Sequence, residues 1–449
     1  MLSIYVLVGL ALGFAACASA QDIVAGATWT DTSGNVIQAH GGGFLKVEST
    51  YYWFGEDKSD NSALFKAVSC YASTDLVNWA RQNDALAPIS ETMISTSDIV
   101  ERPKVLFNSE NSEYVVWFHS DTSNYGAAMV GVATANTPCG PYTYKGSFKP
   151  LGADSRDMGL FQDDDSAQTA YLLYASDNNQ NFKITRLDTD YYNVTTEASV
   201  LTGATLEAPG MVKRDNVYYL FASHTSGWDP NANKFFTASS LSGPWSSEAD
   251  IAPPATRTYF SQNNFDMPLG SDAIYMGDRW RPDLLGSSRY IWYPLDWSSG
   301  NPQIVHADVW QVNLGAGTYT AASGTSYEAE SGTRSGSSTL ITSSAFSGGQ
   351  GVGYLGNGGS VTLNNVQGAG TSQWVALYYA NGDSTWRNTT VSVNGGASVL
   401  VDQPDSGGGD VILSVPVKLN LRQGANSITF GADQSTYAGD LDKIIVYSS

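Results

Sequence analysis

Carboxylate and amide side chains recur where apolar, aromatic-rich segments of this 449-residue chain begin. Glycoside hydrolysis requires an acid that protonates the leaving oxygen and a second group that activates water. Glu207, Asp157 and Glu101 are the acids of this kind, and Gln262 is an amide in the same position. The five polar clusters are Gln38-Ala39-His40, Glu101-Arg102, Arg156-Asp157, Leu206-Glu207 and Gln262-Asn263.

The spacing of these clusters indicates the fold that positions them. Counted from Gln38, Glu101, Asp157, Glu207 and Gln262, the intervals are 63, 56, 50 and 55 residues, and aromatic-rich strands follow each cluster. One four-stranded propeller blade has this length, so the pattern predicts an all-β chain whose first domain is a five-bladed β-propeller. All five clusters would then line the central funnel.

Composition divides the chain into parts. Residues 1–20 have the apolar run and small-residue ending of a secretory signal peptide, and 21–314 hold the predicted propeller. Residues 315–326 are a linker of mainly small residues, and 327–449 have alternating strands at intervals that suit a β-sandwich of the jelly-roll type.

Secretion agrees with two other features. Asn193-Val-Thr and Asn388-Thr-Thr are glycosylation sequons, and the mature chain keeps two cysteines, Cys70 and Cys139. These cysteines form one disulfide or remain free, and the sequence does not decide between the two. We expect an extracellular glycoprotein.

Charge limits the partners. Forty-three acidic and 23 basic residues give a net charge of −20, which opposes binding to nucleic acid or to anionic polysaccharides and favours a neutral partner. The same acidity also serves to keep a secreted protein soluble. No later stretch is apolar enough to cross a membrane. We therefore expect that the protein does not bind membranes. We also expect that it is a monomer.

Other catalytic classes lack their motifs. The chain has no Gly-x-Ser-x-Gly elbow and no phosphate-binding loop, and its four histidines are not at metal-ligand spacing. Serine hydrolysis and zinc catalysis are therefore poor interpretations.

Four segments, Ile37–Phe44, Glu101–Lys104, Ser155–Met158 and Leu206–Pro209, resemble glycoside hydrolase family 43 and, within it, the exo-β-1,3-galactanase branch. The resemblance covers residues 22–313 and implies inversion at the anomeric carbon. It also implies that Glu207 is the general acid and that Asp157 orients this acid and tunes its pKa. An acid in a low-dielectric funnel near a second carboxylate can remain protonated at neutral pH.

The chain departs from the family at the general base. The family has an aspartate at the start of the first blade, where this sequence has His40. Glu101, Gln262 and His40 are the possible replacements. We favour Gln262 as the residue that activates water, through its amide oxygen or a rare imidic-acid tautomer, and Glu101 as a substrate contact. Glu56, Tyr125 and Thr225 lie where strands would turn over the funnel, and we expect them to contact the terminal galactose.

The second domain carries its own candidate sites. Glu328, Glu330 and Asp442 lie near its first and last strands, and oxygen ligands gathered in this way suit a structural Ca²⁺. The pattern resembles carbohydrate-binding module family 35. That resemblance implies a sugar site at the loop edge, with Tyr354, Asn381, Arg387, Tyr437 and Asp440 as its contacts.

The sequence thus predicts a secreted, exo-acting, inverting glycoside hydrolase that releases galactose-containing units from the non-reducing end of β-1,3-galactan. Two alternatives stay open. One is an arabinofuranosidase or xylosidase of the same family, against which the missing aspartate argues. The other is a non-catalytic propeller lectin, which the missing aspartate favours and Glu207 and Asp157 oppose.

Overall fold

The computed structural model describes residues 22–448. The predicted signal peptide, residues 1–20, lies outside this range. Within it, no helix combines the length and the apolar character that a membrane span requires.

Five four-stranded antiparallel sheets make up most of residues 40–304, and in each sheet successive strands are neighbours. Aromatic and β-branched residues alternate along them, which suits strands that pack on both faces. The sheets are β2 (His40–Val47), β3 (Thr50–Glu56), β4 (Val68–Ser73) and β5 (Ala80–Leu86); β6 (Asp98–Asn108), β7 (Glu113–Thr122), β8 (Met129–Ala135) and β9 (Thr143–Phe148); β10 (Met158–Gln162), β11 (Ala170–Ser176), β12 (Asn181–Leu187) and β13 (Val194–Thr202); β14 (Leu206–Arg214), β15 (Val217–His224), β16 (Lys234–Ala238) and β17 (Ala249–Asp250); and β18 (Gln262–Leu269), β19 (Asp272–Arg279), β20 (Arg289–Asp296) and β21 (Gln303–Ile304).

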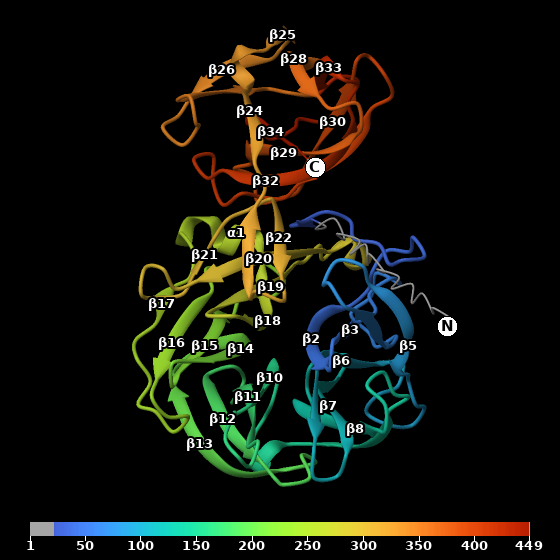
Figure 1. Cartoon of the computed structure of the whole chain (residues 1–449), viewed down its shortest axis with the longest axis vertical. Coiled ribbons are helices and arrows are strands. Elements are labelled where there is room, and N and C mark those ends of the chain that lie inside the picture. The colour runs from blue at the N-terminus through green and yellow to red at the C-terminus, as the bar shows by residue number, and fades with distance from the viewer. Residues whose placement is uncertain (1–21, 449) are drawn as a thin grey trace, which may run out of the picture.

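The first strands of these sheets form a closed ring. Strands β2, β6, β10, β14 and β18 contact one another in that order, and β18 contacts β2. Figure 1 looks into this ring, with the five strands facing its centre. A three-stranded sheet adjoins it, formed by β1 (Ile23–Val24), β22 (Val309–Asn313) and β23 (Thr318–Ala321). The repeat in the sequence therefore corresponds to a ring of sheets, and the predicted linker contributes an edge strand to it.

Residues 324–447 form two facing sheets. Side chains between them make one core, with Val361, Leu377, Ile428, Phe430 and Ile444 each fully buried. The first sheet contains β24 (Gly324–Glu328), β26 (Thr339–Thr342), β27 (Gln350–Gly353), β29 (Ser372–Ala380), β32 (Leu413–Asn420) and β34 (Asp440–Tyr447). The second contains β25 (Thr333–Gly336), β28 (Gly359–Gly368), β30 (Arg387–Val393), β31 (Val399–Gln403) and β33 (Gly424–Phe430).

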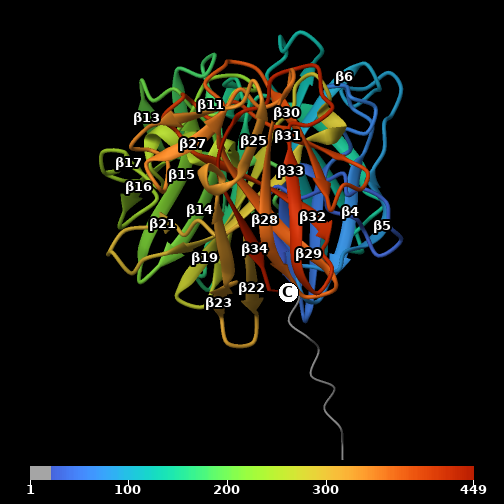
Figure 2. The same cartoon turned by 90° about the horizontal axis from the view of Figure 1, so that it is seen from above.

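The sandwich is packed directly on the ring (Figures 1 and 2). Asp308, which precedes β22, is buried and accepts hydrogen bonds from the hydroxyls of Tyr378 at 2.5 Å and Tyr447 at 2.8 Å. Arg257, in the short helix α1 (Arg257–Phe260), forms an ion pair with Asp405 at 3.0 Å. Polar contacts of this kind fix the two units relative to each other.

A disulfide joins Cys70 of β4 to Cys139, in the turn after β8, with the two Cα atoms 5.6 Å apart. The two possibilities left open by the sequence are thus decided in favour of the bond. It links the outer parts of the first two sheets.

Candidate active site

The inner strands of the ring carry a polar residue at or near their start, called the opener below. A β-bulge that recurs in these strands positions the openers. In β2, β6 and β14 the residue after the opener has a left-handed backbone, with φ of 59° at Gly41, 52° at Arg102 and 55° at Ala208. Pairing with the next strand shifts register immediately afterwards, and β18 shifts in the same way after Asn263. A bulge re-aims the neighbouring side chains. This device turns the openers of several sheets toward one place.

That place is a cavity of about 260 Å³ at the centre of the ring. It brings together all four predicted catalytic residues, Glu207, Asp157, Gln262 and Glu101, with Glu56 and Tyr125. The other lining residues are Arg102, His119, Arg156, Asn179, Gly227, Trp228 and Trp280.

Glu207 has the environment of a proton donor. It is 8% exposed, and burial together with the charge of Asp157 raises its pKa to about 8. Its Oε1 accepts a hydrogen bond from Gln262 Nε2 at 2.9 Å. A carboxylic acid of this kind is largely protonated at neutral pH and can donate a proton.

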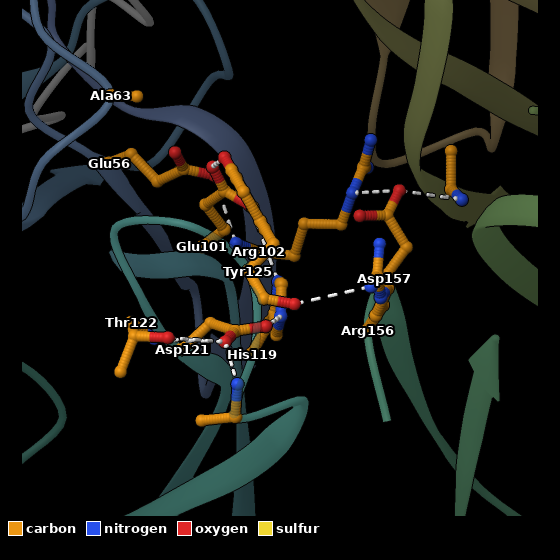
Figure 3. Close-up of polar contacts among 12 residues, drawn as sticks. Glu56, Ala63, Glu101, Arg102, His119, Asp121, Thr122, Tyr125, Arg156 and Asp157 are labelled. Atoms are coloured by element: carbon orange, nitrogen blue, oxygen red, sulfur yellow. Dashed lines mark hydrogen bonds and ion pairs between the residues drawn. The ribbon is translucent and has the colours of Figure 1, made fainter. Parts of the chain in front are cut away.

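Asp157 acts on the acid in two ways. Besides its charge, its Oδ2 accepts from the backbone N–H of Ala208, the residue next to Glu207, at 3.0 Å. The same oxygen lies 2.7 Å from Arg102 Nε, an ion pair visible in Figure 3. Asp157 therefore holds the backbone that carries Glu207.

Gln262 has no free lone pair on its amide oxygen. Oε1 accepts from Arg102 Nη2 at 2.6 Å and from Trp280 Nε1 at 2.9 Å. Both partners are donors only, so the orientation of the amide is fixed. In this arrangement the oxygen predicted to activate water is already occupied.

Glu101 is a buried carboxylate that stays ionised. Burial raises its pKa, but hydrogen bonds from His119 and Tyr125 and the charge of Lys58 outweigh this and bring the pKa to about 2. Tyr125 donates its hydroxyl to Oε1 at 2.7 Å, and His119 Nδ1 lies 3.3 Å from Oε2 (Figure 3). Each carboxylate oxygen keeps a lone pair for a substrate hydroxyl or water.

His119 is a cation within this network. Burial lowers its pKa, but hydrogen bonds to Asp121 and Glu101 raise it to about 9. Glu101, His119 and Asp157 place ligand atoms within 4.8 Å of one another, as a metal site would. Because His119 is protonated and Asp157 is paired with Arg102, we interpret the group as an ion-pair network.

The remaining predicted residues of the ring differ in whether they line the cavity. Glu56 is buried, forms an ion pair with Lys58 at 2.7 Å and accepts from the backbone N–H of Arg102 at 2.9 Å. Thr225 is exposed on its loop and does not line the cavity, whereas Gly227 and Trp228 of that loop do. His40 is fully buried, stacks on Tyr290 and lies outside the cavity, so it cannot act on substrate there.

Sequence reasoning missed Arg102, His119, Trp228 and Trp280. A signal for His119 was present, because it is directly opposite Glu101 in the pairing of β6 and β7. Glu56 likewise lies opposite His40, and Trp280 follows Asp278 and Arg279, the first of which lies opposite Gln262. Residues opposite or just beyond an opener thus form a second layer of the site.

The three predicted calcium ligands of the sandwich influence one another. Burial and the charges of Glu328 and Asp442 raise the pKa of Glu330, whose buried Oε2 has no hydrogen-bond partner among the described residues. Ser347 bridges the other two, donating its Oγ to Glu328 and its backbone N–H to Asp442 at 2.8 Å. An unpartnered oxygen among mutually repelling carboxylates fits a hard cation.

The predicted sugar contacts of the sandwich divide into exposed and buried groups. Tyr354 and Tyr437 are 55% and 42% exposed, with ring centroids 6.2 Å apart. Arg387 donates to the backbone oxygen of Ala438 at 2.8 Å, and burial raises the pKa of Asp440. Asn381 is 1% exposed, and its amide donates to the backbone oxygens of Thr385, in its own loop, and of Gln403, at the end of β31, so it ties that loop to the sheet.

Comparisons with known proteins agree with this geometry. The family model of glycosyl hydrolases family 43 matches residues 42–267. The chain is 77% identical to an exo-β-1,3-galactanase from Phanerochaete chrysosporium, solved with galactose and, as glutamate variants, with β-1,3-galactotriose; the match has a TM-score of 0.94 and covers 95% of this chain and 100% of that one. No curated protein matches.

Two further solved structures are more distant. An exo-β-1,3-galactanase from Clostridium thermocellum is 28% identical, with a TM-score of 0.64 and coverage of 95% of this chain and 100% of that one. A family 43 β-1,3-galactosidase with galactodeoxynojirimycin is 34% identical, with a TM-score of 0.61 and coverage of 64% and 99%.

For the sandwich, a model described as the CBM13 domain of alpha-galactosidase matches residues 360–446. The sequence motifs resemble family 35 instead. Both describe a carbohydrate-binding domain.

Proposed function

Because the chain belongs to glycosyl hydrolase family 43, we propose that it is a secreted exo-β-1,3-galactanase that inverts the anomeric carbon. Its substrate is β-1,3-galactan, the main chain of arabinogalactans, from which it releases galactose or galactose-containing units at the non-reducing end. The 77% identity to the Phanerochaete chrysosporium exo-β-1,3-galactanase supports the substrate class. The ring is then a five-bladed β-propeller and the sandwich a jelly-roll carbohydrate-binding module.

One observation carries the catalytic interpretation: Glu207, with its raised pKa, lines a central cavity beside Asp157 and Arg102. Glu207 would protonate the glycosidic oxygen as the bond to the anomeric carbon breaks. A lectin has no need of an acid held protonated in this way.

Water must attack from the opposite face of the sugar. We assign this water to Gln262 and a substrate hydroxyl to Glu101, whose ionised oxygens suit a hydroxyl donor. The resting geometry adds a condition: Oε1 of Gln262 must first lose one of its two donors, Arg102 or Trp280. Substrate that draws either group away would free the lone pair.

Further contacts follow from position. We assign Glu56 and Tyr125 to the terminal galactose, together with the loop of Thr225 and Trp228. Tyr354, Tyr437, Arg387 and Asp440 would hold a galactan chain at the loop edge of the module, with Asn381 supporting them.

A structural Ca²⁺ in the module would be held by Glu328, Glu330 and Asp442, and would neutralise the repulsion that raises the pKa of Glu330. Catalysis itself needs no metal in this proposal. We expect a monomer that binds neither nucleic acid nor membranes.

The test is incubation with β-1,3-, β-1,4- and β-1,6-galactan and with arabinoxylan, while proton NMR follows the first product. Release from β-1,3-galactan alone, with the α-anomer formed first, is the expected result. Initial β-anomer would refute inversion, cleavage of arabinoxylan would favour the arabinofuranosidase or xylosidase alternative, and no release from any substrate would favour the lectin.

A further inference from the structure

A second cavity, of about 290 Å³, lies where the ring meets the sandwich and shares no lining residue with the catalytic cavity. Arg279 of β19 and Arg289 of β20 come from the ring. Trp374, Trp386 and Lys418 come from the sandwich. Cavities between domains are common places for ligands.

The two arginines form a like-charged pair, and neither has an ion-pair partner among the described residues. Arg279 and Arg289 lie directly opposite each other in the pairing of β19 and β20, a placement that destabilises a sheet when the charges are equal. Neighbouring Arg281 pairs with Asp402 and Asp283. For Arg279 and Arg289, no carboxylate partner exists within residues 22–448, although the whole chain has a net charge of −20.

Both side chains are held firmly and keep donors to spare. Arg279 is 3% exposed and donates to the backbone oxygens of Tyr259 at 2.8 Å and Phe260 at 3.3 Å, which leaves Nη1. Arg289 uses Nη1 on the backbone oxygens of Ser287 and Ser288, which leaves Nε and Nη2. Burial and the positive charges of Arg281 and Arg279 lower the pKa of Arg289, and Asp402 only partly offsets this.

The rest of the wall is suited to a sugar ring. Trp374 and Trp386 line the cavity with Val415, Pro416 and Leu400, and Lys418 Nζ lies 5.3 Å from the centroid of Trp374. Indole surfaces pack against the apolar faces of rings, and guanidinium groups bind carboxylates through paired hydrogen bonds. Asp402, the acid in the wall, is neutralised by its ion pair with Arg281.

We propose that this cavity, the interface cavity, binds a uronic acid residue of an acidic saccharide. The carboxylate lies on the Arg279–Arg289 pair and the sugar ring lies against the tryptophans. An anion here relieves the repulsion between two opposed arginines, and a saccharide ring also uses the apolar walls. The site is independent of the catalytic proposal, because its occupancy is measured without turnover.

The test uses the full chain, with sodium glucuronate as the probe at constant ionic strength. Isothermal titration should show binding of glucuronate, and glucuronate should raise the melting temperature more than equal concentrations of acetate, sulfate or galactose. Arg289→Met should weaken glucuronate binding about tenfold or more, because a charge-assisted pair of hydrogen bonds is lost. Arg334→Met, an exposed arginine of β25, is the matched control.

Three results would overturn the proposal. These are no binding of glucuronate, equal effects of acetate or sulfate, which would reduce the site to one for simple anions, and full binding by Arg289→Met. Lys418→Gln, at an exposed position of the same wall, should also weaken binding, and it serves if Arg289→Met fails to fold. Both variants should hydrolyse neutral β-1,3-galactotriose at the wild-type rate.

Discussion

Gln262 Nε2 donates a hydrogen bond to Glu207 Oε1 across 2.9 Å, from the fifth sheet of the ring to the fourth. Because Oε1 accepts this hydrogen bond, the contact favours Oε2 as the oxygen that carries the proton of the neutral acid. The amide thus selects which carboxyl oxygen presents the proton, and the two donors on its own oxygen keep it in that orientation.

Glu207→Gln should reduce hydrolysis of β-1,3-galactotriose at least about 100-fold, because no proton reaches the leaving oxygen. Binding of galactotriose, measured by titration calorimetry, should be retained, since the amide has nearly the same shape. Glu110→Gln, at an exposed position, is the control. Near-normal turnover of Glu207→Gln would show that Glu207 is not the general acid.

The pH dependence of kcat/KM should have an alkaline limb near pH 8, because Glu207 must be protonated and its pKa is raised to about 8. Asp157→Asn removes the charge that raises this pKa and should move the limb to lower pH. An unchanged limb in Asp157→Asn would show that the charge of Asp157 does not act on the acid.

The same shift affects stability. A carboxyl group whose folded pKa exceeds its unfolded value binds more protons when folded, so its contribution to stability is complete below the ordinary pKa of 4.5. It is lost as the pH rises toward about 8. The melting temperature of Glu207→Gln should therefore fall less between pH 5 and pH 8 than that of the wild type.

Azide distinguishes the two candidates for water activation. It needs no deprotonation, so in a variant without the water-activating group it should attack the anomeric carbon and give α-galactosyl azide as Glu207 protonates the leaving oxygen. Gln262→Ala should lose hydrolysis and regain turnover with azide, whereas Glu101→Gln should not respond. The reverse pattern would assign water activation to Glu101.

Chelation should lower the melting temperature of the full chain in calorimetry, because Glu328, Glu330 and Asp442 would be left to repel one another. Added Ca²⁺ should restore it. Glu330→Gln should melt at the same temperature with and without chelator. If the melting temperature of the wild type does not respond to chelator, the module holds no structural Ca²⁺.

The ring of sheets was predictable from the sequence because the repeat length and the aromatic-rich strands are local patterns that recur along the chain. The sequence also singled out Glu207, Asp157, Glu101 and Gln262, which line the cavity, because each lies in a polar cluster near the start of a strand. Side chains whose direction depends on a bulge were harder to find: Arg102 follows an opener, and its left-handed backbone brings its guanidinium to Asp157 and Gln262.

Residues contributed by the partner strand were missed for a different reason. His119 and Trp280 reach the cavity from β7 and from the end of β19, and their place depends on the register of pairing, which the sequence shows only weakly. The burial of His40 against Tyr290 is likewise a contact between the first and fifth sheets, and no local pattern predicts it.

Because of the repeated bulge, the strand pairing that holds each sheet together does not involve the side chains that face the site. Strand pairing resumes after the shifted position whether the opener is His40, Glu101, Glu207 or Gln262. The pairing of the sheet behind each bulge therefore does not depend on which side chain precedes it. A ring built in this way can carry a histidine at this position in one sheet and an acid at the corresponding position in another.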